Sequence, residues 1–279
     1  MSPTPEHAVL HRPAPGQARL NLGENANGSP PTLRVFRYRI GEETIRTIIG
    51  PVALRLPHAD LAAHAMEALA TSTFMFYTVA EPGDFFADEL CFVPKGDRCD
   101  ILSIHTNGWQ RRQGDLRRSL LDILNHLAAA VACGNLLILD RSELVAETSA
   151  GDQLLRLGIE DSASLALARE ATDLALRSCG VSGLLRQRTV LSISEAATNM
   201  LLHGGGRGTV TLRRLDNRLR IIVADQGAGL NFLNWKDESS ADTPASMGYG
   251  LKIILDYLDS VGLHSGPTGT TLILDRKTD

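Results

Sequence analysis

The stretch "SEAATNMLLHGGG", Ser194 to Gly206, combines an Ala- and Leu-rich helical pattern with three polar residues and then ends in glycines. Glu195, Asn199 and His203 follow one another at intervals of four residues. Because an α-helix has about 3.6 residues per turn, these three side chains project from nearly one face of a single helix. The groups that this polar face contacts must come from other parts of the chain or from a ligand.

Composition and charge exclude several classes of protein. The chain has 279 residues, of which 43% are hydrophobic and 22% charged, so it is typical of globular proteins and long enough for two domains. Its net charge of −4 argues against a dedicated nucleic-acid binder and against charge-driven membrane binding. The sequence lacks a signal segment, a membrane-spanning apolar run and a CxxC pair, which predicts a cytoplasmic protein with reduced cysteines.

The first half of the chain predicts a tail followed by a small mixed domain. Residues 1–31 are rich in Pro, Gly and Asn without sustained periodicity, which indicates a flexible tail. Residues 32–135 alternate β-rich and amphipathic runs, which predicts an α+β domain of unassigned fold. Its expected strands lie at 47–56, 89–95 and 100–105, and its expected helices at 59–72 and 115–132.

Residues 136–279 predict a second domain with a clearer order of elements. Two short strands at 136–140 and 153–159 are followed by helices at 161–180 and 184–203, and then by a hairpin that turns at Asp216 and Asn217. A polar loop, a helix that begins at Gly248 and a strand at 269–276 complete the chain. This order predicts an α/β sandwich in which helices cover one face of a mixed sheet.

Glycines gather at two places where the backbone has to approach another group closely. "DQGAGL" (225–230) follows a strand, and "GYGL" (248–251) opens a helix. Gly-rich turns and helix amino termini expose N–H groups that favour phosphates. Neither motif has the spacing of a dinucleotide-binding fingerprint or of a P-loop.

The polar face of the helix at 184–203 adds chemistry to these glycines. A carboxylate such as Glu195 can accept a proton from a hydroxyl, and an amide oxygen such as that of Asn199 can bind Mg²⁺. The same residues also fit a purely structural explanation, in which Glu195 is solvated, Asn199 is satisfied by backbone and His203 caps the helix carboxy terminus.

Four motifs together resemble a known superfamily. "EAATNMLLHG", "DQGAGL", "GYGL" and "HSGPTGTTLIL" occur in the order and approximate spacing of the N, G1 and G2 boxes and closing strand of the GHKL ATPases. Within that superfamily, residues 140–279 are similar to the small serine kinases that act as anti-sigma factors or stressosome switch kinases. The resemblance implies a Bergerat-type α/β sandwich that binds ATP and Mg²⁺.

The resemblance implies a role for each matching residue of the helix. Glu195 would be the general base or the group that orients the acceptor hydroxyl. Asn199 would be the Mg²⁺ ligand, and His203 would help shape the phosphate side of the site.

The other motifs would bind the nucleotide itself. Asp225 would accept a hydrogen bond from the adenine amino group, and Thr270 would close the adenine side of the site. Gly227 and Gly229 would let the backbone pass the base and ribose. The phosphates would lie at the second glycine box, formed by Gly248, Tyr249, Gly250 and Leu251.

By the same resemblance, the protein would be an ATP- and Mg²⁺-dependent serine/threonine kinase of anti-sigma-factor type in a bacterial signalling switch. Its substrate would be an antagonist protein of the STAS type, and a sigma factor or a partner phosphatase would be its other client. The amino-terminal domain would be sensory, dimerising or partner-selecting, and a homodimer stays open. Two alternatives remain: a non-catalytic ATP-binding module that switches partners, and a soluble histidine kinase that uses His126.

Other candidate residues have weaker patterns. His126 is followed by Leu127 where a phosphoacceptor histidine usually has an acidic residue, which favours a structural role. The loop at 230–247 would be a lid over ATP, with Trp235 and Lys236 as surface or partner-contact residues. A zinc site would need to gather five residues that lack ligand spacing: His58, His64, His105, Cys91 and Cys99.

Overall fold

A computed structural model describes residues 9–11, 32–42, 44–50, 58–80, 87–106, 115–227, 229 and 247–278. The contacts divide the chain into two compact units, residues 1–129 and 130–279. The expected lid, with Trp235 and Lys236, lies outside the described residues, as does most of the expected tail.

The first unit is built on a six-stranded antiparallel sheet with the order β1-β4-β5-β6-β2-β3. Helix α1 (His58–Thr71) packs against β5 and β6. The strands are β1 (Val9–His11), β2 (Thr32–Arg39), β3 (Arg46–Ile49), β4 (Met75–Ala80), β5 (Ala87–Lys95) and β6 (Arg98–Thr106). β1 lies within the segment that the sequence predicts to be a flexible tail. Because β1 pairs with β4, Val9–His11 depart from that prediction.

One face of this sheet holds the core of the first unit. Leu61, Ala65 and Ala68 recur at helical spacing on α1 and are fully buried, as an amphipathic helix on a sheet requires. They pack in one cluster with Phe36 and Phe92.

Helix α2 (Asp115–Cys133) crosses the boundary between the two units and agrees closely with the predicted helix at 115–132. The helix is followed by Gly134, whose φ of 81° suits a residue without a side chain.

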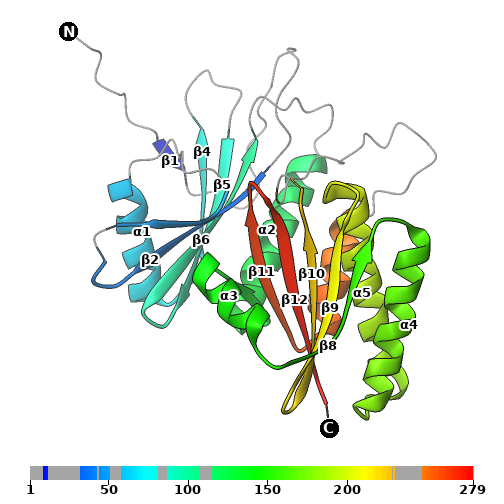
Figure 1. The fold of residues 1–279 in the computed structure, drawn as a ribbon. Helices are drawn as coiled ribbons and strands as arrows, with labels where there is room; N and C mark the ends of the chain where they lie inside the picture. The colour runs from blue at the N-terminus through cyan, green and yellow to red at the C-terminus, as the bar shows by residue number, and fades with distance from the viewer. Residues whose placement is uncertain are drawn as a thin grey trace. The chain divides into compact units, whose positions relative to one another are not determined.

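The second unit is built on a mixed six-stranded sheet with the order β7-β11-β12-β10-β9-β8. β7 is parallel to β11, and all other neighbours are antiparallel. Its elements are β7 (Leu136–Ile138), α3 (Arg141–Ser149), β8 (Asp152–Ile159), α4 (Ser162–Ser178), α5 (Gly183–His203), β9 (Gly208–Leu215), β10 (Arg218–Asp225), α6 (Met247–Tyr257), β11 (Ser260–Gly266) and β12 (Gly269–Lys277). The predicted mixed α/β architecture is confirmed (Figure 1).

Helices α4, α5 and α6 cover one face of this sheet. α4 packs on β8, α5 on β10 and β12, and α6 on β11, while α5 lies between its two neighbours. Asp161 caps α4 by accepting a hydrogen bond from the Ser164 amide at 2.7 Å, which satisfies one of the unpaired donors of its first turn. α5 buries Ile193, Ala197 and Met200 toward the sheet.

A short helix on the opposite face of the sheet is the main addition to the predicted architecture. α3 starts with a capping box in which Asp140 and Glu143 each bind the other's backbone amide. Leu144 of α3 packs against Ile222 and Ile273 of the sheet. No helix is predicted from the sequence at 141–149, and β11 is likewise absent from the predicted strands.

Candidate functional site

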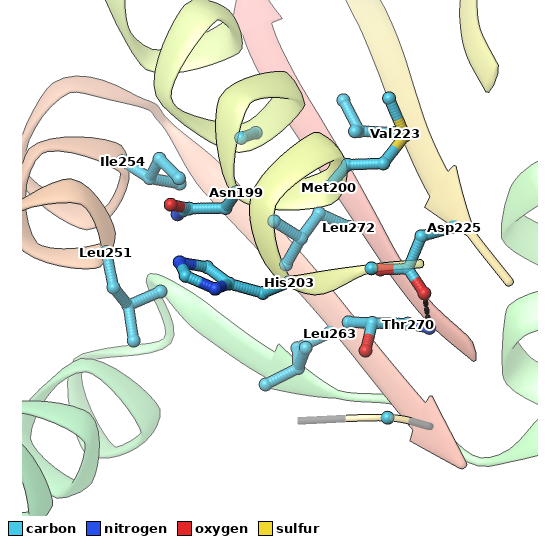
Figure 2. A pocket seen from close by; sticks show the side chains of 13 residues that line it. Asn199, Met200, His203, Val223, Asp225, Leu251, Ile254, Leu263, Thr270 and Leu272 are labelled. Carbon is cyan, nitrogen blue, oxygen red and sulfur yellow. Dashed lines mark hydrogen bonds between the residues drawn. The ribbon is translucent and has the colours of Figure 1, made fainter. Parts of the chain in front are cut away.

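A cavity of about 110 Å³ lies in the second unit between α5, α6 and the ends of β10 and β12. Figure 2 shows its polar side chains, Asn199, His203, Asp225 and Thr270, among aliphatic side chains. The remaining lining residues are small or apolar: Ala196, Met200, Gly204, Val223, Gly229, Leu251, Ile254, Leu263 and Leu272. The cavity can therefore hold a flat apolar group whose polar edge meets a few fixed hydrogen-bonding groups.

Strand alternation explains how polar and apolar side chains share this cavity. Val223 and Asp225 are two residues apart on β10, and Thr270 and Leu272 are two residues apart on β12. Because alternate residues of a strand point to one face, each strand contributes one apolar and one polar side chain. Val223 and Leu272 are not predicted as site residues from the sequence, although this two-residue alternation is the signal that could have indicated them.

Asp225 divides its two carboxylate oxygens between the fold and the cavity. Its Oδ1 accepts hydrogen bonds of 2.9 Å from the amides of Gly227 and Thr270. No described residue donates to its Oδ2, and Figure 2 shows that oxygen turned toward the cavity. Burial raises the pKa of the Asp225 carboxyl, although the two backbone hydrogen bonds act in the opposite direction.

Close backbone packing around Asp225 explains several glycines of the motifs. A Cβ atom at Gly204 would lie 2.5 Å from the Asp225 Cβ, and one at Gly227 would lie 2.9 Å from the Gly204 Cα. Gly229 has a φ of +86°, and its Cβ would lie 2.6 Å from the Gly266 carbonyl oxygen. Side chains are excluded at Gly204 and Gly227 because the end of α5 and the turn after β10 touch there, and at Gly229 because the chain there touches the end of β11. Gly204 is a part of this site that the sequence interpretation does not single out.

Glu195 and Asn199 project from α5 toward the first turns of α6. A Cβ atom at Gly250 would lie 3.0 Å from Glu195 Oε2 and 3.4 Å from Asn199 Nδ2. Asn199 lines the cavity, whereas Glu195 lies beside it, next to Gly250. Both side chains are half-buried, and neither hydrogen-bonds to another described residue. Their polar atoms are therefore available to a ligand between α5 and α6.

His203 and Thr270 complete the polar lining. Figure 2 shows the His203 ring turned into the cavity, and burial lowers the pKa of its imidazole, which favours the neutral ring. The Thr270 hydroxyl lies 3.1 Å from the Ser265 hydroxyl on the paired strand β11. Thr270 thus contacts both Asp225 and β11.

The second glycine box forms the start of α6. The helix begins at Met247, so Gly248, Tyr249 and Gly250 lie in its first turn. The amides of a first turn have no partners within their helix and are suited to bind anions. Leu251, the last residue of the box, lines the cavity.

None of the other candidate residues that the structure describes lines this cavity. Among the described residues, no group of three or more His, Cys, Asp and Glu side chains could hold a metal ion. His126 lies on α2, where its Nε2 is buried and has no hydrogen-bond partner among the described residues. None of the helices in the described part of the chain is both long and apolar enough to span a membrane.

A comparison with models of protein families agrees with the resemblance of the four motifs. Residues 160–276 match the family model of the histidine kinase-like ATPase domain, which confirms the predicted superfamily for that segment. A similar solved structure is that of the RsbU and RsbW domains of Rv1364c from Mycobacterium tuberculosis. It has 14% sequence identity and a TM-score of 0.34, and the match covers 90% of this chain and 97% of that chain. No curated protein matches the sequence.

Proposed function

We propose that this chain, in which residues 160–276 form a histidine kinase-like ATPase domain, is an ATP- and Mg²⁺-dependent serine/threonine kinase that regulates a partner protein. The proposal rests mainly on the arrangement of Asp225. One oxygen of this carboxylate holds the local backbone, and the other is turned into an apolar cavity. The adjacent Glu195 and Asn199 have no hydrogen bonds to other described residues.

Adenine fits the apolar part of the cavity. Its flat ring would pack among aliphatic side chains such as Val223 and Leu272, and its amino group would donate to the Asp225 Oδ2. A carboxylate that only accepts hydrogen bonds favours a base with an amino donor at that position over one with a carbonyl. Thr270, held by its contacts with Asp225 and Ser265, would close the adenine side.

Asn199 is suited to be a ligand of Mg²⁺. Its half-buried amide lines the cavity, faces the start of α6 and has no hydrogen bond to another described residue. Mg²⁺ takes hard oxygen ligands and usually keeps waters and phosphate oxygens beside one or two protein groups, so a single amide oxygen is sufficient. When bound, the ion would neutralise charge on the phosphates. The first-turn amides of α6 would bind the phosphate oxygens.

Glu195 would orient the acceptor and take its proton. The acceptor hydroxyl gives its proton to the Glu195 carboxylate as its oxygen bonds to the γ-phosphorus of ATP. The bond from that phosphorus to the bridging oxygen breaks, and ADP leaves with the electron pair. The absence of a side chain at Gly250 would leave room for this orientation, because a Cβ atom there would lie 3.0 Å from Glu195 Oε2.

The partner follows from the motif resemblance. It would be an antagonist of the STAS type with a Ser or Thr acceptor, and a sigma factor or a partner phosphatase would be the other client. The chain would act in the cytoplasm, and residues 32–135 would receive the signal or select the partner.

Transfer of labelled phosphate from ATP to STAS-domain proteins of the same genome tests this function. We expect the wild-type chain to label a Ser or Thr of one of them, and Glu195→Ala to bind Mg-ATP but lose at least about a hundredfold in rate, the usual scale of a lost general base. ATP binding without labelling of any STAS protein would refute the kinase. Acid-labile label on the chain itself that disappears in His126→Ala would instead support a histidine kinase.

A further inference from the structure

The sides of α4 and α5 that face away from the sheet carry an unusual number of exposed leucines. Their exposed fractions run from 42% for Leu191 to 69% for Leu174. We call this surface the leucine face, and it consists of Leu167, Leu174, Leu184, Leu191 and Leu202. α4 and α5 pack side by side, so the two rows belong to one surface of the second unit.

Helical spacing shows that these leucines lie on the sides of α4 and α5 that face away from the sheet, and not at the margin of the hydrophobic core. Leu167 and Leu174 are seven residues apart on α4 and lie opposite its buried residues, which include Leu165 and Leu176. On α5, Leu184, Leu191 and Leu202 share one face because their separations of seven and eleven residues are close to two and three whole turns. Both helices therefore have a second apolar stripe in addition to the one that covers the sheet.

Glu195 lies in the same row of α5. It is four residues after Leu191 and seven before Leu202, which places it about 6 Å and about 10 Å from them along the helix axis. A macromolecule that brings a hydroxyl to Glu195 along this row would lie over this part of α5. The leucine face is thus continuous with the candidate catalytic residue.

Several of the charged side chains near the leucine face have partners within the same unit. Asp173 binds Arg177 at 2.7 Å and Arg186 at 2.9 Å, and the Arg188 guanidinium lies 5.0 Å from the centre of the Tyr257 ring. What this surface offers to another molecule is mainly apolar area, and exposed apolar patches of this kind mark interaction sites.

We propose that the leucine face is the docking surface for the protein that receives the phosphate. The occupant is a folded acceptor domain that has an apolar patch beside its Ser or Thr. The leucines would bind the patch while Glu195 meets the hydroxyl. This inference rests on the proposed kinase function, and it names which surface of the kinase selects its substrate.

Charge substitutions on the leucine face test the proposal on the full chain. Leu184→Glu and Leu202→Glu each place a carboxylate in an exposed position, so neither disturbs the core. Val145→Glu is the matched control, because Val145 is 61% exposed on α3 at the opposite face of the sheet, against 59% for Leu184 and 66% for Leu202. The acceptor is the purified STAS-domain protein that the wild-type chain labels. Thermal unfolding with and without Mg-ATP checks that each variant folds and binds nucleotide.

We expect both leucine variants to raise the KM for the STAS-domain protein at least tenfold, with the KM for ATP unchanged and Val145→Glu like the wild type. An unchanged acceptor KM in both leucine variants would overturn the docking surface and leave the kinase standing. If the leucine variants instead break a dimer in sedimentation without changing the acceptor KM, the face binds a second copy and the proposal is wrong. If the wild-type chain labels no STAS protein, the kinase and its docking surface fail together.

Discussion

Asp225 shows how a single residue can favour ligand binding at some cost to the stability of the fold. Its Oδ1 is held by two backbone amides, but burial dominates and raises the pKa of the carboxyl. The ionised form is therefore less stable in the folded chain than in water. Such conflicts between local stability and chemistry are typical of functional sites.

Asp225→Asn should separate these two effects. Because the folded-state pKa is raised, the stability that this carboxyl contributes is full below its unfolded pKa and is lost as the pH rises through the folded pKa. The amide of Asn keeps an oxygen for Gly227 and Thr270 without a buried charge. We expect the unfolding midpoint without nucleotide to stay equal or rise at neutral pH, and the stabilisation by Mg-ATP to disappear. A lower midpoint without nucleotide would contradict this view of Asp225.

Gly250→Ala should also change stability and function in opposite directions. Alanine in a helix is favoured over glycine by up to about 1 kcal/mol, but its Cβ would lie 3.0 Å from Glu195 Oε2. The flexible carboxylate can turn away, so we expect the unfolding free energy to stay equal or rise while phosphate transfer falls about tenfold or more through lost orientation. Gly180→Ala, at an exposed helix end with φ +81°, is a control that should lose stability and keep activity.

His203 should make the folded chain sensitive to mild acid. Burial lowers its pKa, so the unfolded chain binds the proton more readily. The stability linked to His203 is present above the unfolded pKa of about 6.5 and is lost as the pH falls through the folded pKa. We expect the wild-type chain to lose more stability than His203→Gln in urea unfolding between about pH 7.5 and about pH 5.5. Equal losses in both proteins would exclude this role.

At the scale of elements, α3 is attached to the sheet by arginines as well as by its apolar side. Arg220 forms two 2.7 Å hydrogen bonds with the buried Asp275 and also binds the Glu147 carbonyl oxygen at 2.8 Å. Arg213 binds the carbonyl oxygens of Ser149 and Ala150 at 2.9 and 2.7 Å. These contacts satisfy carbonyls at the carboxy terminus of α3 that have no partner within the helix.

Removal of Arg220 should therefore destabilise the second unit strongly. Arg220→Ala leaves Asp275 buried without its bidentate partner, and we expect a loss of about 3 kcal/mol in urea unfolding, the lower end for a broken buried pair. Arg218 contacts the same carboxylate at 3.3 Å from a half-exposed position. Arg218→Ala should therefore lower the free energy of unfolding by less than about 1 kcal/mol. Similar losses for the two variants would refute the buried network.

Elements were predictable where local pattern and tertiary role agree. The long periodic runs of α1, α2, α4 and α5 and the β9–β10 hairpin fold as the sequence predicts. α3 is not predicted because it buries no residue, so its only signal is the capping box of Asp140 and Glu143. β11 is not predicted because "SVGLHSG" (260–266) continues directly from α6 and contains glycines; its strand state depends on pairing with β12 and β7.

The polar residues of the candidate site were more predictable from the sequence than its apolar residues. Motif order indicated Asn199, Asp225 and Thr270 together, although they come from three elements, and the structure places all three in one cavity. Leu263 and Ile254 carry no such signal, because any buried strand or helix offers similar residues. The position of Glu195 beside the cavity also depends on the packing of α5 against α6, which spacing on one helix cannot give.

At the scale of the whole molecule, the division into two units predicts two separable unfolding steps. Each unit has its own sheet and core, and the described residues that line the candidate ATP site all belong to the second unit. A ligand stabilises only the cooperative unit that binds it. At Mg-ATP concentrations of about 100 times the dissociation constant, we expect the second unit to gain about 2.7 kcal/mol, with the first unit unchanged.

Hydrogen exchange read by mass spectrometry can assign each step to its unit. Peptides from β5 and β6 report on the first unit, and peptides from β10 and β12 report on the second. Mg-ATP should slow exchange only in the β10 and β12 peptides under mild denaturant, and Asp225→Asn should remove that protection. Equal slowing in both sets would mean that the two units unfold as one cooperative body. In that case a signal received by residues 32–135 could act on the ATP site by changing the stability of the whole chain, because the two sites would then share one unfolding equilibrium.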